Sequence, residues 1–403
     1  MGTLIGIGNT AFNTGSISAP PFLSAPLTSD LALTAGTGTF SLTRATAASG
    51  KTTGDLVYFE TAGNPVFWGN DGVLIQKTST NLVKYSNTLD QAGVWDKGTF
   101  DATAVQDATG PDGTTSAWTV TDNSNDLEEL RQTGIAIVNA TQYTACFIFK
   151  KTTAAANWQG IACQLGSKWL TVVFNTNTGT ANAMSFDSGT TVRLVESFND
   201  DWWVVTLSDT SAGTFAIMVY YPAFNTTGSD TAVSTTQGTG VMYNMQLESG
   251  SYATTSILAG ASSETRFNDV LSLDQSPPVN DFTIELNWTP QEDTGAEDIW
   301  SSYLDANNYL KLYYDGTDVI FDKTIGGTTY DANYTINIVK GTTYALKGEL
   351  SSVDGVQVYV DAAAGTLDAN AGDAVVGTNT EIGSFNNSGR TALAVKNLII
   401  IEI

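Results

Sequence analysis

The sequence predicts an all-β protein with two antiparallel β-sandwich domains of the jelly-roll type, preceded by an extended N-terminal segment. Only 14% of the 403 residues are charged, and Thr, Ser, Asn and Gly (38 Gly) take their place. This composition is typical of strands joined by many turns. Short runs of β-branched and aromatic residues recur along the chain, and no helical pattern exceeds a turn or two. At about 150 residues per domain, the length fits two or three domains.

The first 80 residues form the expected N-terminal arm and attachment region. Residues 1–43 contain a single ionisable side chain, Asp30, and few core-forming residues. Two interpretations remain open, a flexible leader or an arm that becomes ordered only against a partner. The residues that we single out as a candidate assembly arm are Pro20, Pro21, Phe22 and Pro26.

The second region, residues 81–263, is expected to form a jelly roll. Eight short apolar runs separated by Gly, Asn and Asp turns suggest two packed antiparallel sheets. The expected strands are 134–140, 143–151, 159–166, 169–176, 191–198, 202–209, 214–221 and 241–248. Trp202 and Trp203 are adjacent on one of them, so they must face opposite sides of the sheet.

The third region, residues 264–403, is expected to form a second β-sandwich. A Pro-containing segment, 272–281, reads as a linker or a first turn. The expected strands are 282–288, 298–304, 309–315, 318–324, 328–336, 343–350, 356–362, 380–385 and 395–401. The run 309–316 alternates regularly and ends in an Asp-Gly turn, which is a strong hairpin signal.

Charge and composition exclude several functions. The chain has 17 Lys and Arg against 41 Asp and Glu, a net charge of −24. So acidic a surface disfavours nucleic acid and anionic membranes as partners. The absence of histidine excludes Ser-His-Asp and Cys-His catalysis and His-ligated zinc. No apolar run approaches the ~18 residues of a membrane span. The chain start lacks a basic signal-peptide region, which predicts synthesis in a cytoplasm.

The two cysteines do not make a disulfide framework. Cys146 and Cys163 lie on neighbouring expected strands and could face each other, or could be two small buried hydrophobic residues. The sequence does not decide whether they are paired.

The sequence favours a protein without enzymatic activity or a required cofactor. A carboxylate pair could act in glycoside hydrolysis, but the acidic clusters 126–129, 200–201 and 292–298 lack alternate strand spacing. We interpret them as solvated turn residues. Calcium remains possible because turn oxygens suit a hard cation, although no Asp-x-Asp-x-Asp-Gly loop is present. The candidate ligands are Asn307, Asn308, Asp315, Asp318 and Asp354.

Aromatic residues could bind sugars by stacking. Most tryptophans on strands are expected to be buried. Trp158, in an apparent Ala-Asn-Trp-Gln-Gly turn, is the best candidate for a glycan-stacking surface residue.

Several short phrases occur in a fixed order along the chain. They begin with Phe-Ser-Leu-Thr-Arg-Ala-Thr and a Gly-Asn-Pro turn, and continue with Thr-Asn-Leu-Val-Lys-Tyr-Ser and an Ala-Thr-Gly-Pro-Asp-Gly-Thr turn. Gln-Leu-Glu-Ser-Gly followed by Thr-Thr, and then Arg-Phe-Asn-Asp, complete the set. These phrases occupy residues 40–46, 63–65, 80–86, 108–114, 246–255 and 266–269. In this order they resemble a family of tailed-bacteriophage virion proteins.

The resemblance implies a structural protein of the virion surface, of the fiber, spike or capsid-decoration type. It implies that 81–263 is similar to a carbohydrate-binding-module jelly roll and that 264–403 resembles a concanavalin A-like or laminin-G-like sandwich. The expected partners are other virion proteins of capsid or tail and further copies of the chain, most simply a homo-trimer. The alternatives are a tail adhesin that binds a host-surface glycan and, with least support, a polysaccharide depolymerase.

Overall fold

The computed structural model describes most of the chain from residue 23 onward. The described residues are 23–27, 33, 39–43, 48–51, 57–60, 72–96, 102–124, 128–152, 158–189, 192–224, 237–251, 253–267, 269–291, 295–378, 380–385 and 393–402. Every regular element among them is a β-strand, which confirms the all-β prediction. None of these residues forms a helix long and apolar enough to cross a membrane.

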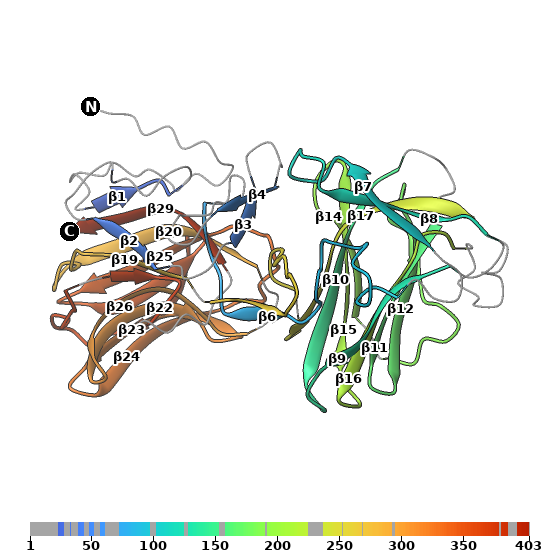
Figure 1. Ribbon diagram of the computed structural model, residues 1–403. Helices are drawn as coiled ribbons and strands as arrows, with labels where there is room; N and C mark the ends of the chain where they lie inside the picture. Colours follow the sequence, from blue (N-terminus) through green and yellow to red (C-terminus); the bar gives the residue numbers. More distant parts are fainter. Residues whose placement is uncertain are drawn as a thin grey trace. The chain divides into compact units, whose positions relative to one another are not determined.

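The described residues divide into two compact units (Figure 1). One unit, the jelly roll, extends from Ser79 to Arg266 with a short piece ending at Tyr58. The other, the C-terminal sandwich, combines Phe267–Ile403 with described residues from Met1–Thr53 and Phe59–Thr78. The pair β3 (Ala48–Lys51) and β4 (Val57–Glu60) forms a small separate ribbon.

The jelly roll has two antiparallel sheets. The β10 sheet consists, in spatial order, of β14 (Val192–Ser197), β15 (Trp202–Thr210), β10 (Gln142–Lys150), β17 (Gly238–Ser249), β8 (Ala117–Asp122) and β7 (Thr103–Ala108). The β11 sheet consists of β13 (Ala181–Asn182), β12 (Lys168–Asn175), β11 (Trp158–Leu165), β16 (Phe215–Tyr221) and β9 (Leu130–Ala136). A further short pair joins β6 (Ser79–Asn81) to β18 (Glu264–Arg266).

Strand pairing makes the jelly-roll topology explicit. β8 pairs with β17, β9 with β16, β10 with β15 and β11 with β12, as in one long hairpin rolled into two layers. The hairpin turns at Gly166, whose φ of 69° suits glycine. Alternate residues of β11, namely Ile161, Cys163 and Leu165, face the shared core, where they meet Phe147 and Phe149 of β10.

The C-terminal sandwich also has two sheets. The β20 sheet consists of β1 (Leu23–Ala25), β29 (Leu393–Glu402), β20 (Phe282–Pro290), β25 (Tyr344–Ser351), β26 (Gly355–Val360) and β27 (Ala363–Asp368), with β5 (Val73–Ile75) also pairing with β29. The β22 sheet consists of β2 (Phe40–Thr43), β19 (Val270–Leu273), β28 (Thr380–Ile382), β21 (Glu297–Asp305), β22 (Asn308–Tyr314), β23 (Asp318–Ile325) and β24 (Thr328–Thr335).

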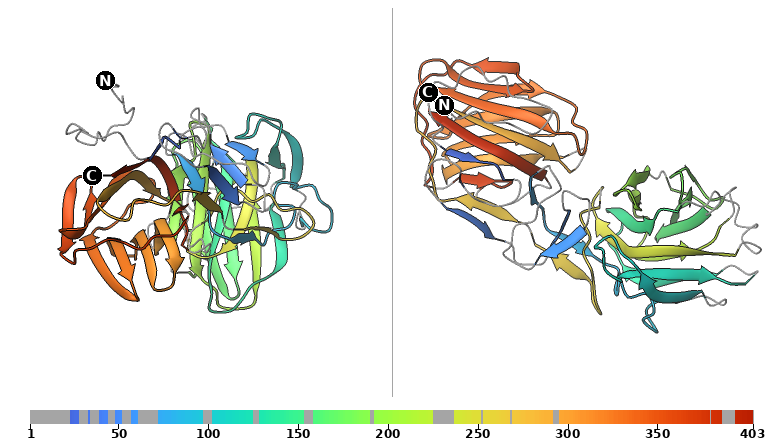
Figure 2. Two further views of the ribbon diagram at one scale, coloured as in Figure 1. Left: turned by 90° about the vertical axis from the view of Figure 1, so that its left-hand side faces the viewer. Right: turned by 90° about the horizontal axis from the view of Figure 1, so that it is seen from above.

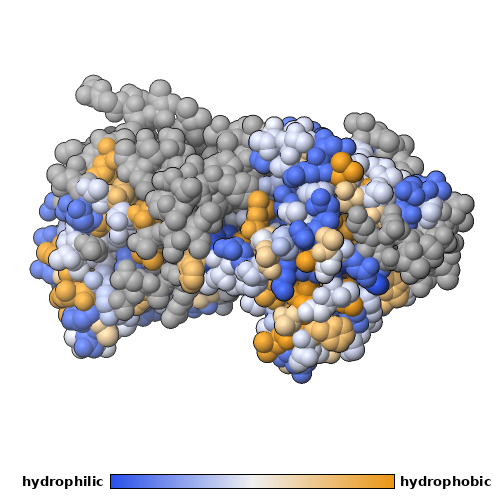
Figure 3. Space-filling view, viewed as in Figure 1, coloured by the Kyte–Doolittle hydropathy of each residue, from blue (hydrophilic) through white to orange (hydrophobic). Residues whose placement is uncertain are grey.

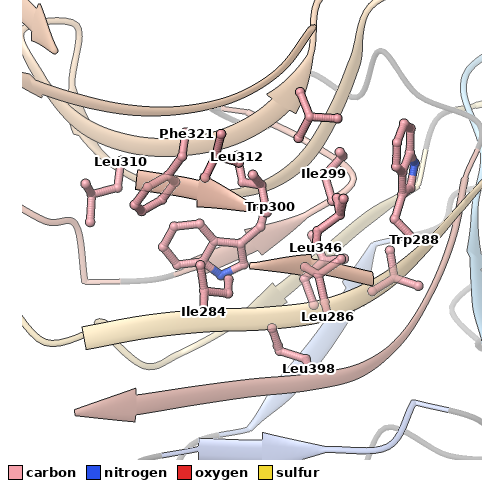
Figure 4. Close-up of a cluster of buried hydrophobic side chains, with 14 of the residues drawn as sticks. Ile284, Leu286, Trp288, Ile299, Trp300, Leu310, Leu312, Phe321, Leu346 and Leu398 are labelled. Atoms are coloured by element: carbon pink, nitrogen blue, oxygen red, sulfur yellow. The ribbon is translucent and has the colours of Figure 1, made fainter. Parts of the chain in front are cut away.

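Large apolar side chains from both sheets fill the core of this unit. Trp300 of the β22 sheet lies among residues such as Ile284 and Leu346 of the β20 sheet (Figure 4). Trp288, which is fully buried, donates its indole N–H to Glu297 Oε2 at 2.8 Å. These contacts bury apolar surface on the inner faces, and the outer faces carry the polar residues of the alternating strands.

The N-terminal region differs from the prediction of a separate arm. Residues 1–80 were expected to precede the sandwiches, yet β1, β2 and β5 are strands of the C-terminal sandwich. Figures 1 and 2 show β1 in blue beside β29 in red. These strands have three or four residues each and stand between Gly-, Ser- and Thr-rich stretches, so they produce no recognisable periodicity.

Candidate functional site

The predicted sugar-stacking residue, Trp158, begins strand β11. It is half-buried rather than fully exposed, and it packs against the apolar cluster on the outer face of the β11 sheet. Its carbonyl accepts a hydrogen bond from the amide of Phe224 at 2.9 Å. The residue therefore shows part of its indole at the surface while the remainder is held by its neighbours.

Aromatic rings gather next to Trp158. The rings of Tyr221 and Phe224 meet edge to face with centroids 5.6 Å apart. Gly160 lies beneath them, and a Cβ there would come within 2.9 Å of Phe224 and 3.1 Å of Tyr221. Glycine is thus needed at this position because the rings rest directly on the backbone of β11.

Charged groups lie on the same face, on edge strand β9 and just before it. The Arg131 guanidinium contacts Asp96 at 2.8 Å and Glu129 at 2.9 Å. Glu129 also accepts a hydrogen bond from the Tyr221 hydroxyl. Burial raises the pKa of Glu129, and the Arg131 charge opposes that shift. Arg131 and Asp96 are 39% and 50% exposed, so their pairing contributes little stability and leaves both groups accessible to a ligand.

We name Glu129, Arg131, Trp158, Tyr221 and Phe224 the Trp158 face. Tyr221 and Phe224 are buried and support Trp158, whose partly exposed ring can stack on sugar C–H groups. The carboxylate and the guanidinium can bind sugar hydroxyls. Sequence reasoning found Trp158 but missed the charged pair. The alternation Glu129-Leu130-Arg131 could have revealed it, because it places two opposite charges on one side of a strand that buries Leu130.

Most of the other tryptophans are buried. Trp95, Trp118, Trp202, Trp288 and Trp300 are buried, as expected for tryptophan on strands. The adjacent pair does face opposite ways. Trp202 joins an apolar cluster outside the β10 sheet, while Trp203 packs on Gly179 and donates its indole N–H to the Thr176 carbonyl at 2.7 Å.

Residues from the virion-protein resemblance meet around Asn81, which is fully buried. Its side-chain oxygen accepts hydrogen bonds from the amides of Val83 (3.0 Å) and Leu247 (3.1 Å). Its side-chain nitrogen donates to the carbonyls of Met245 (3.3 Å) and Ile257 (2.8 Å). One asparagine thus ties the Thr-Asn-Leu phrase to the Gln-Leu-Glu phrase more than 160 residues later.

The Gln-Leu-Glu phrase continues this network through Glu248, which is fully buried. Glu248 accepts hydrogen bonds from the amide and hydroxyl of Thr254 at 2.8 and 2.6 Å and from Gln246 at 2.7 Å. Arg266 is 1% exposed and donates to the Thr255 hydroxyl at 3.0 Å. Burial raises the pKa of Glu248, and the Arg266 charge counteracts it. These motif residues therefore have structural roles in one buried hydrogen-bond network.

The Pro-Asp-Gly-Thr turn has a structural role as well. Asp112 Oδ1 accepts hydrogen bonds from the Thr114 amide at 3.0 Å and the Ser116 hydroxyl at 2.6 Å. Gly113 has a φ of 76°, a value that favours glycine. The motif therefore closes the connection between β7 and β8.

The candidate calcium ligands occupy turns of the C-terminal sandwich without converging. Asp315 Oδ1 accepts hydrogen bonds from the amides of Thr317 and Asp318, both at 2.8 Å, and Asn308 binds Asp305 and the Gly326 amide. Asp354 belongs to a different turn, where it contacts Ser351. Within the described ranges, no three acidic or cysteine side chains are grouped as a metal site.

Three acidic residues differ from the expectation of solvated turns. One of them, Glu128, is 2% exposed and accepts a hydrogen bond from the Asn123 amide at 3.0 Å. Glu297 and Asp298 open strand β21 and are only 1% and 3% exposed. That interpretation is wrong for them, because Glu297 points to Trp288 in the core and Asp298 forms an ion pair with Lys311 at 2.6 Å. The alternation of the strand sends them to opposite faces, so they do not converge as a catalytic pair.

The remaining candidates are placed as follows. Cys146 and Cys163 are buried thiols on different sheets, and no disulfide joins them. Pro20, Pro21 and Phe22 lie outside the described residues. Pro26 follows β1, and its carbonyl accepts a hydrogen bond from Asn397 at 2.9 Å. Pro26 therefore lies against the C-terminal strand of its own chain.

Exposed apolar side chains do not concentrate on the Trp158 face. The most exposed large ones include Val353 (75%), Val138 (65%) and Val339 (57%), which belong to different units. On the side seen in Figure 3, apolar and hydrophilic residues are interspersed over both units. Scattered apolar residues of this kind are normal for a folded protein.

No protein-family model matches the chain, and no curated protein sequence matches it. Among solved structures, a native heptameric SAP-like pentraxin from Limulus polyphemus matches with a TM-score of 0.27 and 16% identity, over 32% of this chain and 68% of the pentraxin chain. Domains LG4-5 of the mouse laminin alpha1 chain match with a TM-score of 0.27 and 10% identity, over 69% and 86% respectively. These scores are too low to carry an argument, and the β-sandwich architecture rests on the strand pairing itself.

Proposed function

We propose that this chain is a non-enzymatic structural protein of a tailed-bacteriophage virion, of the fiber, spike or decoration type. The supporting observation is that the phrases resembling this family meet in one buried network around Asn81, Glu248 and Arg266. Asn81 and Leu247 are 166 residues apart along the chain, and their hydrogen bond joins two of these phrases. The proposal includes a homo-oligomer, attached through the N-terminal segment, whose C-terminal sandwich is of the concanavalin A or laminin-G type.

Two properties suit a particle surface. A disulfide-free β fold can form in a reducing host cytoplasm, and an excess of negative charge keeps crowded copies soluble.

Particle composition tests this proposal. Purified phage particles analysed by mass spectrometry and electron cryomicroscopy should contain the chain in a stoichiometry that matches a symmetry axis of head or tail. A chain lacking residues 1–22 should fold and yet fail to join particles, because attachment is assigned to that end. Absence of the full-length chain from the particles would refute the virion assignment.

The Trp158 face supports a second candidate function, binding of a host-surface glycan. Trp158, which is half-buried, presents part of its aromatic surface on the face that carries Arg131 and Glu129. A glycan array probed with the full chain should give a defined set of ligands. Trp158→Ala should abolish binding, whereas Phe215→Ala, which changes an exposed ring elsewhere on the jelly roll, should leave it unchanged. Equal loss in both variants, or no ligand, would exclude this function without affecting the virion proposal.

A further inference from the structure

The outer face of the β22 sheet carries a straight row of polar residues. Cross-strand partners run from Glu381 to Ser301, Lys311, Asp322 and Asp331, one on each of five neighbouring strands. Directly opposed residues in antiparallel strands share a face, so these five side chains lie on one side of the sheet. We name them the Lys311 row. Their neighbours along the strands, such as Leu310, Leu312 and Phe321, point into the core.

Lys311 shows how this face receives a cation. Its ammonium forms an ion pair with Asp298 at 2.6 Å and lies 4.1 Å from the ring centre of Tyr313 and 4.8 Å from that of Phe385. Phe385 in turn meets Tyr303 and Tyr309 edge to face at 5.1 and 5.0 Å. Carboxylate and aromatic faces together are the surroundings that favour ammonium and guanidinium groups.

One carboxylate oxygen of Asp322 accepts no hydrogen bond on this face. It is 5% exposed, and its atom Oδ1 is buried without a hydrogen-bond partner. The other interactions of this carboxylate are a hydrogen bond from Tyr313 and the charges of Lys311 and Asp331. A buried carboxylate oxygen with no donor is costly, and a donor that also brings positive charge relieves that cost most.

The charge balance selects the class of donor. Asp298 pairs with Lys311, and Glu381 and Asp331 supply two further carboxylates to this face. Asp322, whose pKa is raised by burial to about 7, adds another negative charge once it loses its proton. A neutral hydroxyl ligand would leave this excess in place, whereas a cation would reduce it. A metal ion is not favoured, since no group of three acidic or cysteine ligands exists among the residues that the structure describes.

We propose that the outer face of the β22 sheet, around Asp322 and Asp331, binds a basic side chain of a partner protein, with its guanidinium or ammonium group beside the tyrosine rings. Asp331 is exposed and forms the point of entry. Asp322 accepts a hydrogen bond from the bound cation at Oδ1, the oxygen that has no donor in the structure. This inference does not depend on the virion proposal, because it concerns the chemistry of one surface.

Binding should release a proton from this face. Burial raises the pKa of Asp322 to about 7, and Asp331 adds to that effect while Tyr313 and Lys311 oppose it. A bound cation favours the ionised carboxylate, so affinity should increase between pH 6 and pH 8 as Asp322 loses its proton.

Calorimetric titration of the full chain with a capped tri-arginine peptide tests the proposal. A tri-citrulline peptide has the same shape without the charge and should bind at least about tenfold more weakly. Asp331→Asn should weaken tri-arginine binding about threefold, as expected for an exposed ion pair. Asp322→Asn should weaken it about tenfold and remove the pH dependence. The matched control Asp354→Asn alters an exposed acid in the turn between β25 and β26, in the other sheet of the same sandwich, and should have no effect.

Three results would overturn the proposal. Equal weakening by Asp354→Asn would mean attraction to the acidic surface as a whole. Equal binding of tri-citrulline would mean recognition of hydrogen-bonding groups without charge. Chemical-shift changes at Tyr313 and Asp331 with maltohexaose, and none with tri-arginine, would assign the face to a glycan.

Discussion

The jelly roll and the C-terminal sandwich are built from the chain in different ways. The jelly roll uses an almost continuous segment, Ser79–Arg266, whose strands pair as one rolled hairpin. The C-terminal sandwich pairs the first described strand, β1, with the last, β29, and also takes β2 and β5 from the N-terminal region. The comparison teaches that a unit of one continuous segment can be outlined from sequence, whereas a unit completed by distant short strands cannot.

The largest difference between the two units should appear when each is expressed as a separate fragment. We expect fragment 79–266 to fold alone with a cooperative transition, and fragment 267–403 to remain unfolded or aggregate. The second fragment lacks Ala25, Leu27, Val73 and Ile75, all buried in its core. Each lost core side chain of this size costs about 1–4 kcal/mol, and the sum exceeds the stability of a typical domain. Circular dichroism and urea unfolding measure whether each of the two fragments folds cooperatively. Cooperative folding of 267–403 by itself would contradict the shared-core assignment.

Buried cations provide the next comparison, one in each unit. Arg266→Met should destabilise the jelly roll by about 3–5 kcal/mol, because it leaves the buried Glu248 carboxylate without its counter-charge. Lys323→Met should cost the C-terminal sandwich only about 1–2 kcal/mol, because the Lys323 ammonium donates to the carbonyls of Asn370 and Gly372 rather than to a buried carboxylate. Hydrogen exchange measured peptide by peptide assigns each loss to its unit. A larger loss for Lys323→Met would reverse this ranking.

Buried acids should give the two units different pH profiles. Burial raises the pKa of Asp322 to about 7 and that of Asp122, in the jelly roll beside Glu128, to about 6. Both values exceed the ordinary 3.8, so the folded state keeps a proton that the unfolded state has lost. The resulting stabilisation is full below about pH 4 and disappears as pH rises through 6 in the jelly roll and 7 in the C-terminal sandwich.

The variants Asp122→Asn and Asp322→Asn should each remove this decline from their own unit only. Urea midpoints followed by hydrogen exchange between pH 4 and pH 8 measure the effect. An unchanged slope in Asp322→Asn would show that Asp322 is ionised in the folded state at neutral pH.

Two hairpin glycines supply the smallest comparison. Gly166→Ala should cost the jelly roll about 3 kcal/mol, because its φ is 69° and a Cβ would lie 2.2 Å from the Ala212 carbonyl oxygen. Gly316→Ala in the C-terminal sandwich should cost only about 1 kcal/mol, since its φ is 108° but no atom lies within 4 Å of the added Cβ. Thermal unfolding distinguishes them. Equal costs would mean that the backbone conformation of Gly166 alone requires a glycine, and that the close approach of Ala212 adds nothing.

Most individual strands could be predicted because their apolar residues alternate. The run 309–315 became β22 (Asn308–Tyr314), and 202–209 became β15 (Trp202–Thr210). Acid positions were less predictable. Glu297 and Asp298 come shortly after Gly295 and resemble solvated turn residues. In the structure, the indole of Trp288 binds Glu297 and the ammonium of Lys311 pairs with Asp298, which reduces the cost of burying both acids.

The candidate sites, too, could be predicted only in part from the sequence. Trp158 could be selected from the sequence, because a ring beside small and polar residues is a surface signal. The residues around it come from β9 and β16, and the Lys311 row crosses five strands whose order the sequence does not specify.

By itself, the sequence determined that the chain forms antiparallel strands, where most of them lie, and that it is strongly acidic. These properties follow from alternation, turn residues and composition, which are local or additive. The tertiary structure alone decided that N-terminal strands complete the C-terminal core, that Asn81, Glu248 and Arg266 share one network, and that Asp322 lies beside Asp331. Those outcomes depend on pairing between distant segments, whose free energy comes from burial and hydrogen bonds that exist only once both partners are in place.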